Sequence, residues 1–368
     1  MLDRIAFWLD RGDCQIFRLN GYAGTGKTTL IQEAARQAGG SVVFAALTGR
    51  AASVMRAKGC DGAATIDSLL YKPLLKDSCA RAEGPCSMPP CAPRCQHHRQ
   101  RLIGKTLNED SDLAAADLAV IDEVSMIGPE MGADIERLGR PLLVVGDPAQ
   151  LPPIHGAGYF NGTADFLLTE IHRQAAASPV ISMATHFRNG EQCRYAERDG
   201  SAIVPRIGER EMLGFDQIIV GRHKTRQDVN RRYRALLGIR DPLPVVGDKL
   251  VCLKNQAGLG IYNGTIWRAA EVGRAADGFI PLAVEDEDGR QVEVEAPVEG
   301  FLATDGKGGE LPGHPFAFGY AITCHKAQGS QWGSVLIFDE SRLWRTDRWR
   351  WLYTAVTRAV ERVTVVRS

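Results

Sequence analysis

A glycine-rich segment, residues 21–28, constrains the fold of this chain more than any other feature. It reads Gly-Tyr-Ala-Gly-Thr-Gly-Lys-Thr, with an apolar run before it and a run typical of a helix after it. In a strand–loop–helix of this kind, successive backbone N–H groups surround a phosphate, and the positive end of the helix faces the same anion. The lysine reaches the outer phosphates, and the hydroxyl of the last threonine binds Mg²⁺. We therefore expect a nucleoside triphosphate site made by Gly21, Gly24, Thr25, Gly26, Lys27, Thr28 and Thr29.

Two acids follow a second apolar run. Residues 118–121 read Leu-Ala-Val-Ile, as expected for a strand covered on both faces, and Asp122 and Glu123 come directly after it. Asp122 is placed to bind Mg²⁺, and Glu123 is placed to orient and deprotonate an attacking water. Adjacent acids after a strand are common as solvated loop residues. Together with the phosphate loop, however, they predict hydrolysis of the nucleotide.

A third apolar run, residues 141–146, leads into a polar turn that ends in Gln150. This segment resembles motif III of superfamily 1 helicases, in which the Gln senses the γ-phosphate. Segments similar to motifs Ia, Ib, II, the arginine-bearing segment that closes the first motor domain, V and VI occur in the same order, at residues 47–52, 64–70, 120–126, 168–174, 320–330 and 353–359. The sequences of these segments are similar to the motifs of the RecD/Dda branch, superfamily 1B, whose members move 5′→3′ on single-stranded DNA. The resemblance therefore implies an ATP-dependent DNA helicase.

Strands and helices alternate in both halves of the chain, which predicts two parallel sheets. The strands expected for the first sheet are residues 15–19, 41–47, 118–124 and 141–146, and those for the second are 216–220, 334–338 and 362–366. The resemblance implies two RecA-like lobes with ATP between them. It also implies that Arg358 reaches the γ-phosphate from the opposite lobe, and that Arg173 lies near the junction.

Two insertions interrupt this alternation. Short strands around an Asn263-Gly264 turn look like the SH3-like barrel that the family inserts before motif V, and another segment stands where family members carry a wedge, often a β-hairpin, that splits the duplex. The expected fold is an α/β protein of two RecA-like parallel-sheet lobes, with a Cys-rich insertion in the first lobe and an SH3-like β-barrel insertion in the second. The expected parts are lobe 1A at 1–70 and 114–175, insertion 1B at 71–113, lobe 2A at 176–247 and 313–368, and insertion 2B at 248–312.

The insertion at the wedge position contains four of the nine cysteines, Cys79, Cys86, Cys91 and Cys95. Disulfides are rare in cytosolic proteins, so a Cys cluster in a Pro-rich loop favours a metal. Four thiolates can hold tetrahedral Zn²⁺, or an iron–sulfur cluster as the less favoured choice. The spacing is not a standard zinc pattern, and a Cys-rich loop without metal is the alternative. The four Pro residues between Cys79 and Cys95 are expected to prevent regular strand pairing.

The resemblance also implies that the protein binds single-stranded and duplex DNA, and it indicates which residues contact the DNA. Positions at which family members touch phosphates and bases are occupied by Thr48, Arg50, Ser68, Thr323, His325 and Lys326. The formal net charge is zero, so contacts with nucleic acid must come from local basic tracks rather than from a uniformly positive surface. Phosphate contacts give affinity without reading sequence, as a translocating motor requires.

The remaining expectations concern the setting of the motor. No apolar run is long enough to span a bilayer, and the start of the chain lacks the form of a signal peptide, so we expect a monomeric cytoplasmic protein that does not bind membranes. Family members usually read adenine with a Gln shortly before the phosphate loop, whereas here no Gln precedes Gln15. The competing hypotheses are a translocating ATPase that does not separate strands and, less favoured, a phosphotransferase acting on a small molecule.

Overall fold

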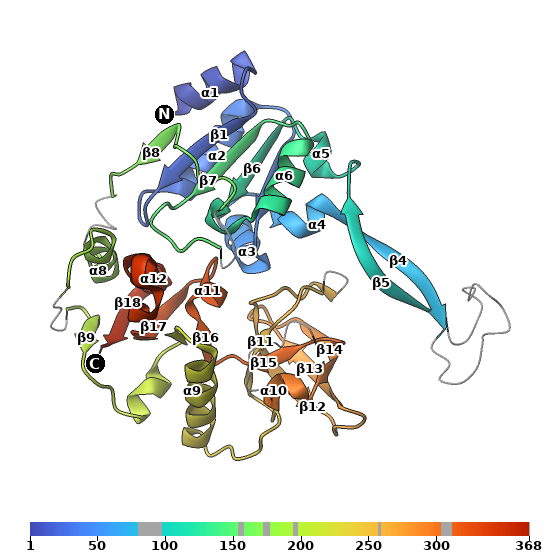
Figure 1. Ribbon diagram of the computed structural model, residues 1–368, viewed down its shortest axis with the longest axis vertical. Coiled ribbons are helices and arrows are strands. Elements are labelled where there is room, and N and C mark those ends of the chain that lie inside the picture. Colours follow the sequence, from blue (N-terminus) through green and yellow to red (C-terminus); the bar gives the residue numbers. More distant parts are fainter. Residues whose placement is uncertain are drawn as a thin grey trace.

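The structure is a computed structural model that describes residues 1–79, 98–153, 158–171, 177–193, 198–256, 259–302 and 311–367, with backbone alone for 75–79 and 98–103. The described part contains two parallel sheets, an antiparallel sheet and a two-stranded ribbon. The first parallel sheet lies at the top of Figure 1, the second at the lower left, and the antiparallel sheet at the lower right. No helix in these ranges is long and apolar enough to cross a membrane.

The first lobe is a six-stranded sheet in the order β3-β2-β6-β7-β1-β8, and its strands pair in parallel. Its strands are β1 (Ile16–Gly21), β2 (Val42–Ala46), β3 (Ala64–Thr65), β6 (Leu118–Asp122), β7 (Leu142–Gly146) and β8 (Phe166–Leu168). Its helices are α1 (Leu2–Arg11), α2 (Lys27–Ala38), α3 (Gly49–Ala57), α4 (Ile66–Leu70), α5 (Asp112–Ala115) and α6 (Pro129–Arg137). Leu118 and Val120 belong to the core that contains residues of α1 and α2, whereas Ala119 and Ile121 belong to the core that contains Ile135 of α6. Because both faces are covered, β6 is apolar throughout, as the sequence predicts.

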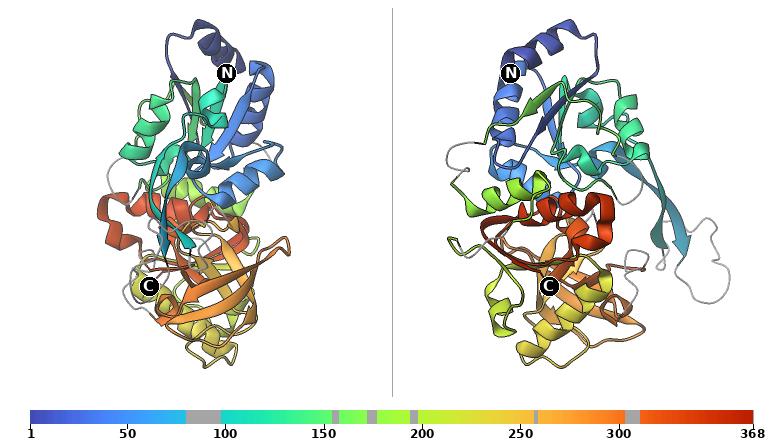
Figure 2. Two further views of the ribbon diagram at one scale, coloured as in Figure 1. Left: turned by 90° about the vertical axis from the view of Figure 1, so that its right-hand side faces the viewer. Right: turned by 60° about the vertical axis from the view of Figure 1, so that its left-hand side comes forward.

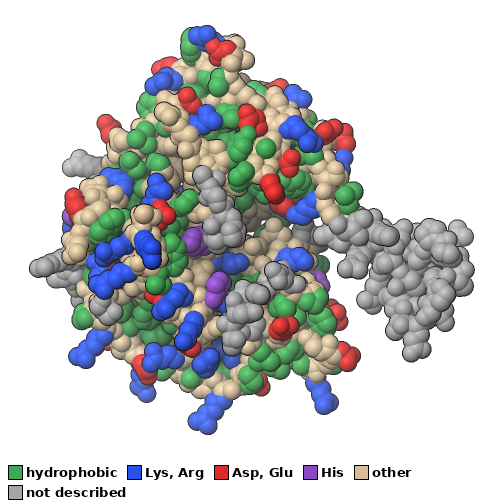
Figure 3. All heavy atoms as spheres, viewed as in Figure 1, with side chains coloured by type: hydrophobic (Ala, Val, Ile, Leu, Met, Phe, Trp, Pro, Cys, Tyr) green, Lys and Arg blue, Asp and Glu red, His purple; other side chains and the backbone are tan. Residues whose placement is uncertain are grey.

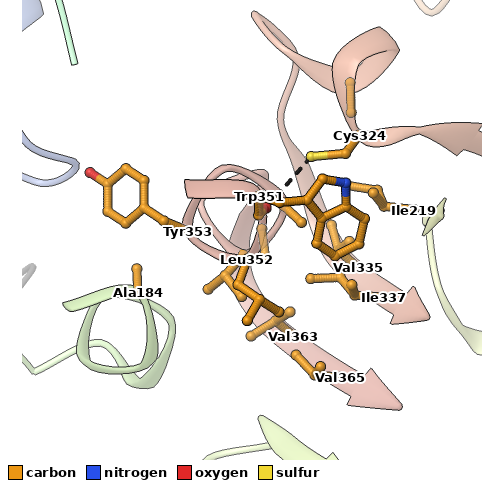
Figure 4. Packing of buried hydrophobic residues seen from close by; sticks show 14 of the residues in the cluster. Ala184, Ile219, Cys324, Val335, Ile337, Trp351, Leu352, Tyr353, Val363 and Val365 are labelled. Carbon is orange, nitrogen blue, oxygen red and sulfur yellow. Dashed lines mark hydrogen bonds between the residues drawn. The ribbon is translucent and has the colours of Figure 1, made fainter. Parts of the chain in front are cut away.

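The second lobe is a five-stranded parallel sheet in the order β16-β10-β17-β18-β9. Its strands are β9 (Ala202–Val204), β10 (Gln217–Val220), β16 (Ala321–Thr323), β17 (Trp332–Phe338) and β18 (Ala359–Val366), and its main helices are α8 (Pro179–Arg188), α9 (His223–Leu236), α11 (Cys324–Ala327) and α12 (Arg348–Val356). Trp351 and Leu352 of α12 lie over Val335 and Val363 of the sheet (Figure 4). The predicted pair of parallel α/β sheets is therefore confirmed.

The antiparallel sheet has the order β14-β13-β12-β11-β15. It consists of β11 (Lys249–Cys252), β12 (Ile266–Val272), β13 (Phe279–Glu285), β14 (Gln291–Pro297) and β15 (Phe316–Phe318), with the short helix α10 (Glu299–Leu302) beside it. We call it the 2B sheet. Closure into an SH3-like barrel stays a prediction. The insertion is expected to end at residue 312, whereas the 2B sheet extends further along the chain, because β15 pairs with β11.

The chain passes from the 2B sheet to the second lobe at Gly319. A Cβ atom at this position would lie 2.9 Å from the carbonyl carbon of Leu250, so only glycine allows the close approach. The surrounding sequence is a nearly continuous apolar run into β16, and this is why the switch between sheets is not visible in the sequence pattern.

The two described ends of the segment at the wedge position pair with each other as the strands of a hairpin. Strand β4 (Tyr71–Cys79) pairs antiparallel with β5 (His98–Leu107), from Tyr71 opposite Leu107 to Cys79 opposite His98. The ribbon projects from the first lobe away from the rest of the molecule (Figures 1 and 2). None of the four prolines of the Cys-rich stretch lies in this described stem, so the expectation that they prevent strand pairing stays a prediction. Cys86, Cys91 and Cys95 lie outside the described residues.

Candidate nucleotide site and nucleic-acid interface

The phosphate loop connects β1 to α2 and depends on its glycines. Gly24 and Gly26 have φ angles of 78° and 77°, in the left-handed region that favours glycine. A Cβ atom at Gly21 would lie 2.8 Å from Oγ1 of Thr25. Helix α2 begins at Lys27, directly after Gly26, so the first N–H groups of the helix face the inside of the loop. This backbone is the anion-binding turn that the sequence predicts.

The polar side chains of the loop lie close to its carbonyl groups. Nζ of Lys27 donates to the carbonyl oxygens of Gly21 and Tyr22, at 2.8 and 3.1 Å. Oγ1 of Thr25 donates to the carbonyl oxygen of Tyr22 at 2.7 Å. The ammonium group is therefore held at the loop, and a bound phosphate oxygen can replace these carbonyl partners. Thr28 is half-buried and Thr29 exposed in the first turn of α2.

The two predicted acids lie at the carboxyl end of β6, and β1 ends at the same edge of the sheet. The N–H of Glu123 donates to Oδ1 of Asp122 at 2.8 Å. Burial raises the pKa of Asp122 to about 6, repulsion by Glu123 adds to the rise, and the charge of Lys27 opposes it. Glu123 has a φ angle of 56°, which is strained for a residue with a Cβ atom. The fold thus brings Asp122 and Glu123 to the phosphate loop.

Gln150 lies in the turn after β7. The turn is held by Asp147, whose Oδ1 accepts from the N–H of Ala149 at 3.0 Å and whose carbonyl oxygen accepts from the N–H of Gln150 at 3.1 Å. The Gln150 side chain is buried, and its Oε1 atom has no hydrogen-bond partner among the described residues. A buried amide with unused bonding capacity is expected where a ligand or water binds.

Arg358 lies at the end of the segment that connects α12 to β18 and is almost fully buried. Its guanidinium donates to the carbonyl oxygens of Thr354 and Ser330, at 3.1 and 3.3 Å, and to Oγ1 of Thr357 at 3.1 Å. In this structure the group therefore binds its own lobe. The role of Arg358 in trans stays a prediction, and Arg173 lies outside the described residues.

Several residues that join the lobes at this site were not predicted. The hydroxyl of Tyr353 contacts both Ala23 of the phosphate loop and Asp147, and Thr354 and Gln328 bond to the backbone of Leu151. One indication of their role was available in the sequence, since Gln328, Tyr353 and Thr354 lie inside the segments similar to motifs V and VI.

A further contact between the lobes involves Arg188 of α8. Its guanidinium carbon lies 3.9 Å from the centre of the Tyr22 ring, within the range of a cation–π interaction. The two residues line a cavity of about 230 Å³ together with Pro148, Ala149, Trp349 and Arg350. Basic groups of the second lobe thus face the phosphate loop.

Predicted DNA-binding residues of both lobes lie near the loop between β11 and β12 of the 2B sheet, which contains Tyr262 and Asn263 and is called the 2B loop below. Thr48 caps α3 by accepting from the N–H of Ala51 at 3.2 Å. A Cβ atom at Gly329, just after α11, would lie 2.6 Å from Oγ1 of Thr48, so the two lobes touch here. A Cβ atom at Gly49 would lie 2.3 Å from the ring of Tyr262 in the 2B loop.

Contacts within the protein occupy the two cationic members of this set. Arg50 forms an ion pair with Glu287, in the turn between β13 and β14 of the 2B sheet. Nζ of Lys326 donates to Oδ1 of Asn263 in the 2B loop. Burial lowers the pKa of Lys326 to about 8. Because these partners come from the 2B sheet, DNA has to compete with that sheet for both side chains.

Of the other three predicted DNA contacts, Thr323 and Ser68 form local hydrogen bonds and His325 is partly buried. Thr323 caps α11, where its Oγ1 accepts from the N–H of Lys326 at 3.4 Å. Burial lowers the pKa of His325 below its ordinary value, which favours the neutral imidazole. Oγ of Ser68 donates to the carbonyl oxygen of Thr65 at 2.8 Å. None of these contacts tests a role in DNA binding.

Basic side chains gather on the second lobe, as the neutral net charge requires of a nucleic-acid-binding protein. Lys and Arg cover the lower left of the molecule, where α9 and α12 lie (Figure 3). Helix α9 carries Lys224, Arg226, Arg231 and Arg232 on this lobe, whereas its Arg234 is buried in an ion pair with Asp248.

The metal prediction for the Cys-rich insertion gains no support. Within the described ranges, no group of three or more His, Cys, Asp or Glu side chains is arranged to hold a metal ion. Three of the four cysteines lie outside those ranges, so zinc stays a prediction that elemental analysis of the purified protein would test.

Comparison with known proteins agrees with this geometry. Residues 11–202 match the family model of an AAA domain, and residues 318–366 match that of a UvrD-like helicase C-terminal domain. The chain is 30% identical to the ATP-dependent RecD2 DNA helicase of Deinococcus radiodurans over 280 residues, which cover 68% of this chain and 36% of that protein. It is 28% identical to the RecBCD enzyme subunit RecD of Mycolicibacterium smegmatis, over 95% of this chain and 67% of that protein. The chain thus spans only about a third of the length of RecD2.

The solved structure of a Pif1 helicase from Bacteroides, in complex with ADP-AlF3 and single-stranded DNA, shares the fold. The TM-score is 0.57 at 20% sequence identity, and the match covers 99% of this chain and 91% of that one.

Proposed function

Because the chain belongs to the RecD-like helicases of superfamily 1B, we propose that it is an ATP-dependent DNA helicase that moves 5′→3′ along single-stranded DNA. The observation that carries the proposal is the bonding between the lobes at the nucleotide site. The phosphate loop and the Gln150 turn of the first lobe are hydrogen-bonded directly to α12 and to the end of α11 in the second. Such a site can convert a change at the nucleotide into movement between the lobes.

We assign the hydrolytic roles as follows. Lys27 compensates the charge on the transferred phosphate, Glu123 orients and deprotonates the attacking water, and Gln150 senses the γ-phosphate. The oxygen donors of Thr28 and Asp122 suit Mg²⁺, and a cation there would also counter the repulsion between Asp122 and Glu123. When bound, Mg²⁺ would neutralise charge on the phosphates. Arg358, once released from its own lobe, would stabilise the charge that develops during transfer.

We also infer how DNA binds. Thr48, Arg50, Ser68, Thr323, His325 and Lys326 are proposed to contact the strand where the first lobe, the second lobe and the 2B loop meet. This location is supported by the close approach of Gly329 to Thr48 and of Gly49 to Tyr262. Basic residues of α9 would add attraction for phosphates without reading sequence.

The β4–β5 hairpin is proposed as the element that separates the duplex, because it projects from the first lobe between the motif Ib-like and motif II-like segments. Lys72 and Thr106 are opposite each other in the hairpin, so a two-residue Asn-Gly turn can join them and remove the rest. The shortened protein should keep ATPase activity stimulated by single-stranded DNA and lose strand separation. Full strand separation by the shortened protein would exclude the hairpin as the wedge.

Two measurements test the proposed function itself. ATPase activity with and without single-stranded DNA separates a motor from a small-molecule phosphotransferase, because only a motor should be stimulated. Strand displacement from duplexes with a 5′ or a 3′ single-stranded tail then measures helicase activity and its direction. Displacement only with a 5′ tail is expected. DNA-stimulated hydrolysis without strand displacement on either substrate would indicate a translocating ATPase that does not separate strands.

A further inference from the structure

The turn that carries Gln150 is fixed by a buried carboxylate with two different partners. Asp147 is 2% exposed. Its Oδ1 atom accepts from the N–H of Ala149 in its own turn. Its Oδ2 atom accepts from the hydroxyl of Tyr353, in α12 of the second lobe, at 2.5 Å. The turn is therefore bonded on one side to itself and on the other side to the opposite lobe.

The same hydroxyl also reaches the phosphate loop. The N–H of Ala23 donates to the oxygen of Tyr353 at 2.8 Å. One group of the second lobe thus bridges two loops of the first, one that surrounds the phosphates and one that carries Gln150. Figure 4 shows the Tyr353 ring pointing away from the side of α12 where Trp351 and Leu352 pack, with its oxygen at the far end. Burial and the charge of Asp147 raise the pKa of Tyr353 well above its usual range, so the hydroxyl stays a proton donor.

The backbone beyond Gln150 is bonded to the second lobe as well. The N–H of Leu151 donates to Oγ1 of Thr354 at 2.9 Å, and its carbonyl oxygen accepts from Nε2 of Gln328 at 3.0 Å. Gln150 therefore lies between two points, Asp147 and Leu151, that are both held by the opposite lobe. The position of Gln150 thus depends on contacts with the second lobe as well as on the first lobe.

We propose that Tyr353 is a positioning residue that couples closure of the lobes to ATP turnover, by holding the phosphate loop and the Gln150 turn in their reactive arrangement. The proposal rests on the ATPase function proposed above. The hydroxyl can bridge the two loops only when the lobes are together at this edge. Its contribution should therefore appear in the closed, reacting state and not in the first binding of nucleotide.

Tyr353→Phe isolates the hydroxyl. The ring packs in the core of the second lobe, against which Ala23 and Ala149 also lie, and phenylalanine fills the same space. What is lost is one bond to a carboxylate and one from a backbone N–H. A hydrogen bond to a charged group changes an equilibrium by about tenfold or more. If the bond is made only in the closed state, kcat should fall by about that factor while the affinity for ATP stays within about twofold.

Tyr71→Phe is a matched control. The hydroxyl of Tyr71 donates to Oδ2 of Asp134 at 2.8 Å, so this variant also loses a bond between a tyrosine and an aspartate, but within the first lobe. Thr354→Val is a second test that does not depend on Tyr353. It removes the bond to the N–H of Leu151 and should lower kcat in the same way, since it releases the other end of the Gln150 turn.

The experiment measures kcat, KM for ATP and nucleotide affinity with saturating single-stranded DNA, together with thermal melting to verify folding. It compares wild type with Tyr353→Phe, Thr354→Val and Tyr71→Phe, and with Asp147→Asn alone and combined with Tyr353→Phe. A selective loss of kcat in Tyr353→Phe and Thr354→Val, but not in Tyr71→Phe, is expected. Combining Tyr353→Phe with Asp147→Asn should cost less than the sum of the two single losses, because both act on one bond.

The outcomes separate the inference from the function on which it rests. Wild type that shows no DNA-stimulated hydrolysis would overturn the proposed function, and the inference with it. An active wild type with an unchanged kcat in folded Tyr353→Phe would overturn the inference alone. Equal losses of kcat and of ATP affinity would also overturn it, because they would make Tyr353 a contact that acts in binding as much as in turnover.

Discussion

The ion pair between Arg50 and Glu287 leads to a quantitative prediction about DNA affinity. Arg50 is a proposed phosphate contact of the first lobe, and Glu287 lies in an acidic turn of the 2B sheet. A phosphate that binds Arg50 must first replace the carboxylate. Glu287→Gln removes that charge and keeps the length and polarity of the side chain, so affinity for single-stranded DNA should rise.

The exposure of the pair sets the size of the effect. The side chains are 32% and 55% exposed, for Arg50 and Glu287 respectively, so solvent screens the interaction. Exposed ion pairs contribute about 0.2 to 1 kcal/mol, which corresponds to a gain in affinity of at most roughly fivefold. Screening by salt also predicts that most of the gain disappears when the ionic strength is raised to roughly 1 M.

The assay is fluorescence anisotropy of a labelled oligothymidine, titrated with wild type and variants at low salt. Asp288→Asn is the matched control, because it removes one negative charge from the same turn without touching the ion pair. The third variant is Glu287→Gln in an Arg50→Ala background, where no gain is expected.

Two results would refute the reasoning. If Asp288→Asn raised affinity as much as Glu287→Gln, the turn would act through its general negative field. If Glu287→Gln still raised affinity without Arg50, the competition would not pass through this pair.

Three further predictions concern other site residues. Glu123→Gln should bind ATP and DNA normally and stop turnover, because an amide cannot accept the proton of the attacking water; near-normal hydrolysis would remove Glu123 as the general base. Arg358→Ala should lower DNA-stimulated turnover by about a thousandfold or more. It should also lower the free energy of unfolding in urea by about 2–4 kcal/mol, since the buried carbonyls of Thr354 and Ser330 lose a donor; unchanged stability would contradict the contacts seen here. Affinity for single-stranded DNA should fall as pH rises through about 8, where Lys326 loses its proton and its charge. Lys326→Arg should largely remove this step, and an identical pH profile in that variant would exclude Lys326 as its source.

The features that the sequence predicts correctly are local in the chain. Eight consecutive residues specify the phosphate loop, because glycines at fixed positions permit its backbone and a strand and a helix flank it. Apolar runs identify buried parallel strands, and the parallel order places their carboxyl ends at one edge, where Asp122, Glu123 and Gln150 lie. Each of these conclusions needs only neighbouring residues and the regular geometry of strands.

Only the tertiary structure decides which distant groups meet. Tyr353 bonds to residues 206 and 330 positions away, and Arg50 pairs with a residue 237 positions away. No periodicity encodes such pairs, because they depend on how separately folded sheets pack against each other. The same is true of the passage at Gly319, where the chain leaves β15 of the 2B sheet for β16 of the second lobe, and of Arg358, whose donors are satisfied within its own lobe. Backbone geometry is a local property of the sequence, whereas the partner of a polar side chain is a property of the assembled lobes.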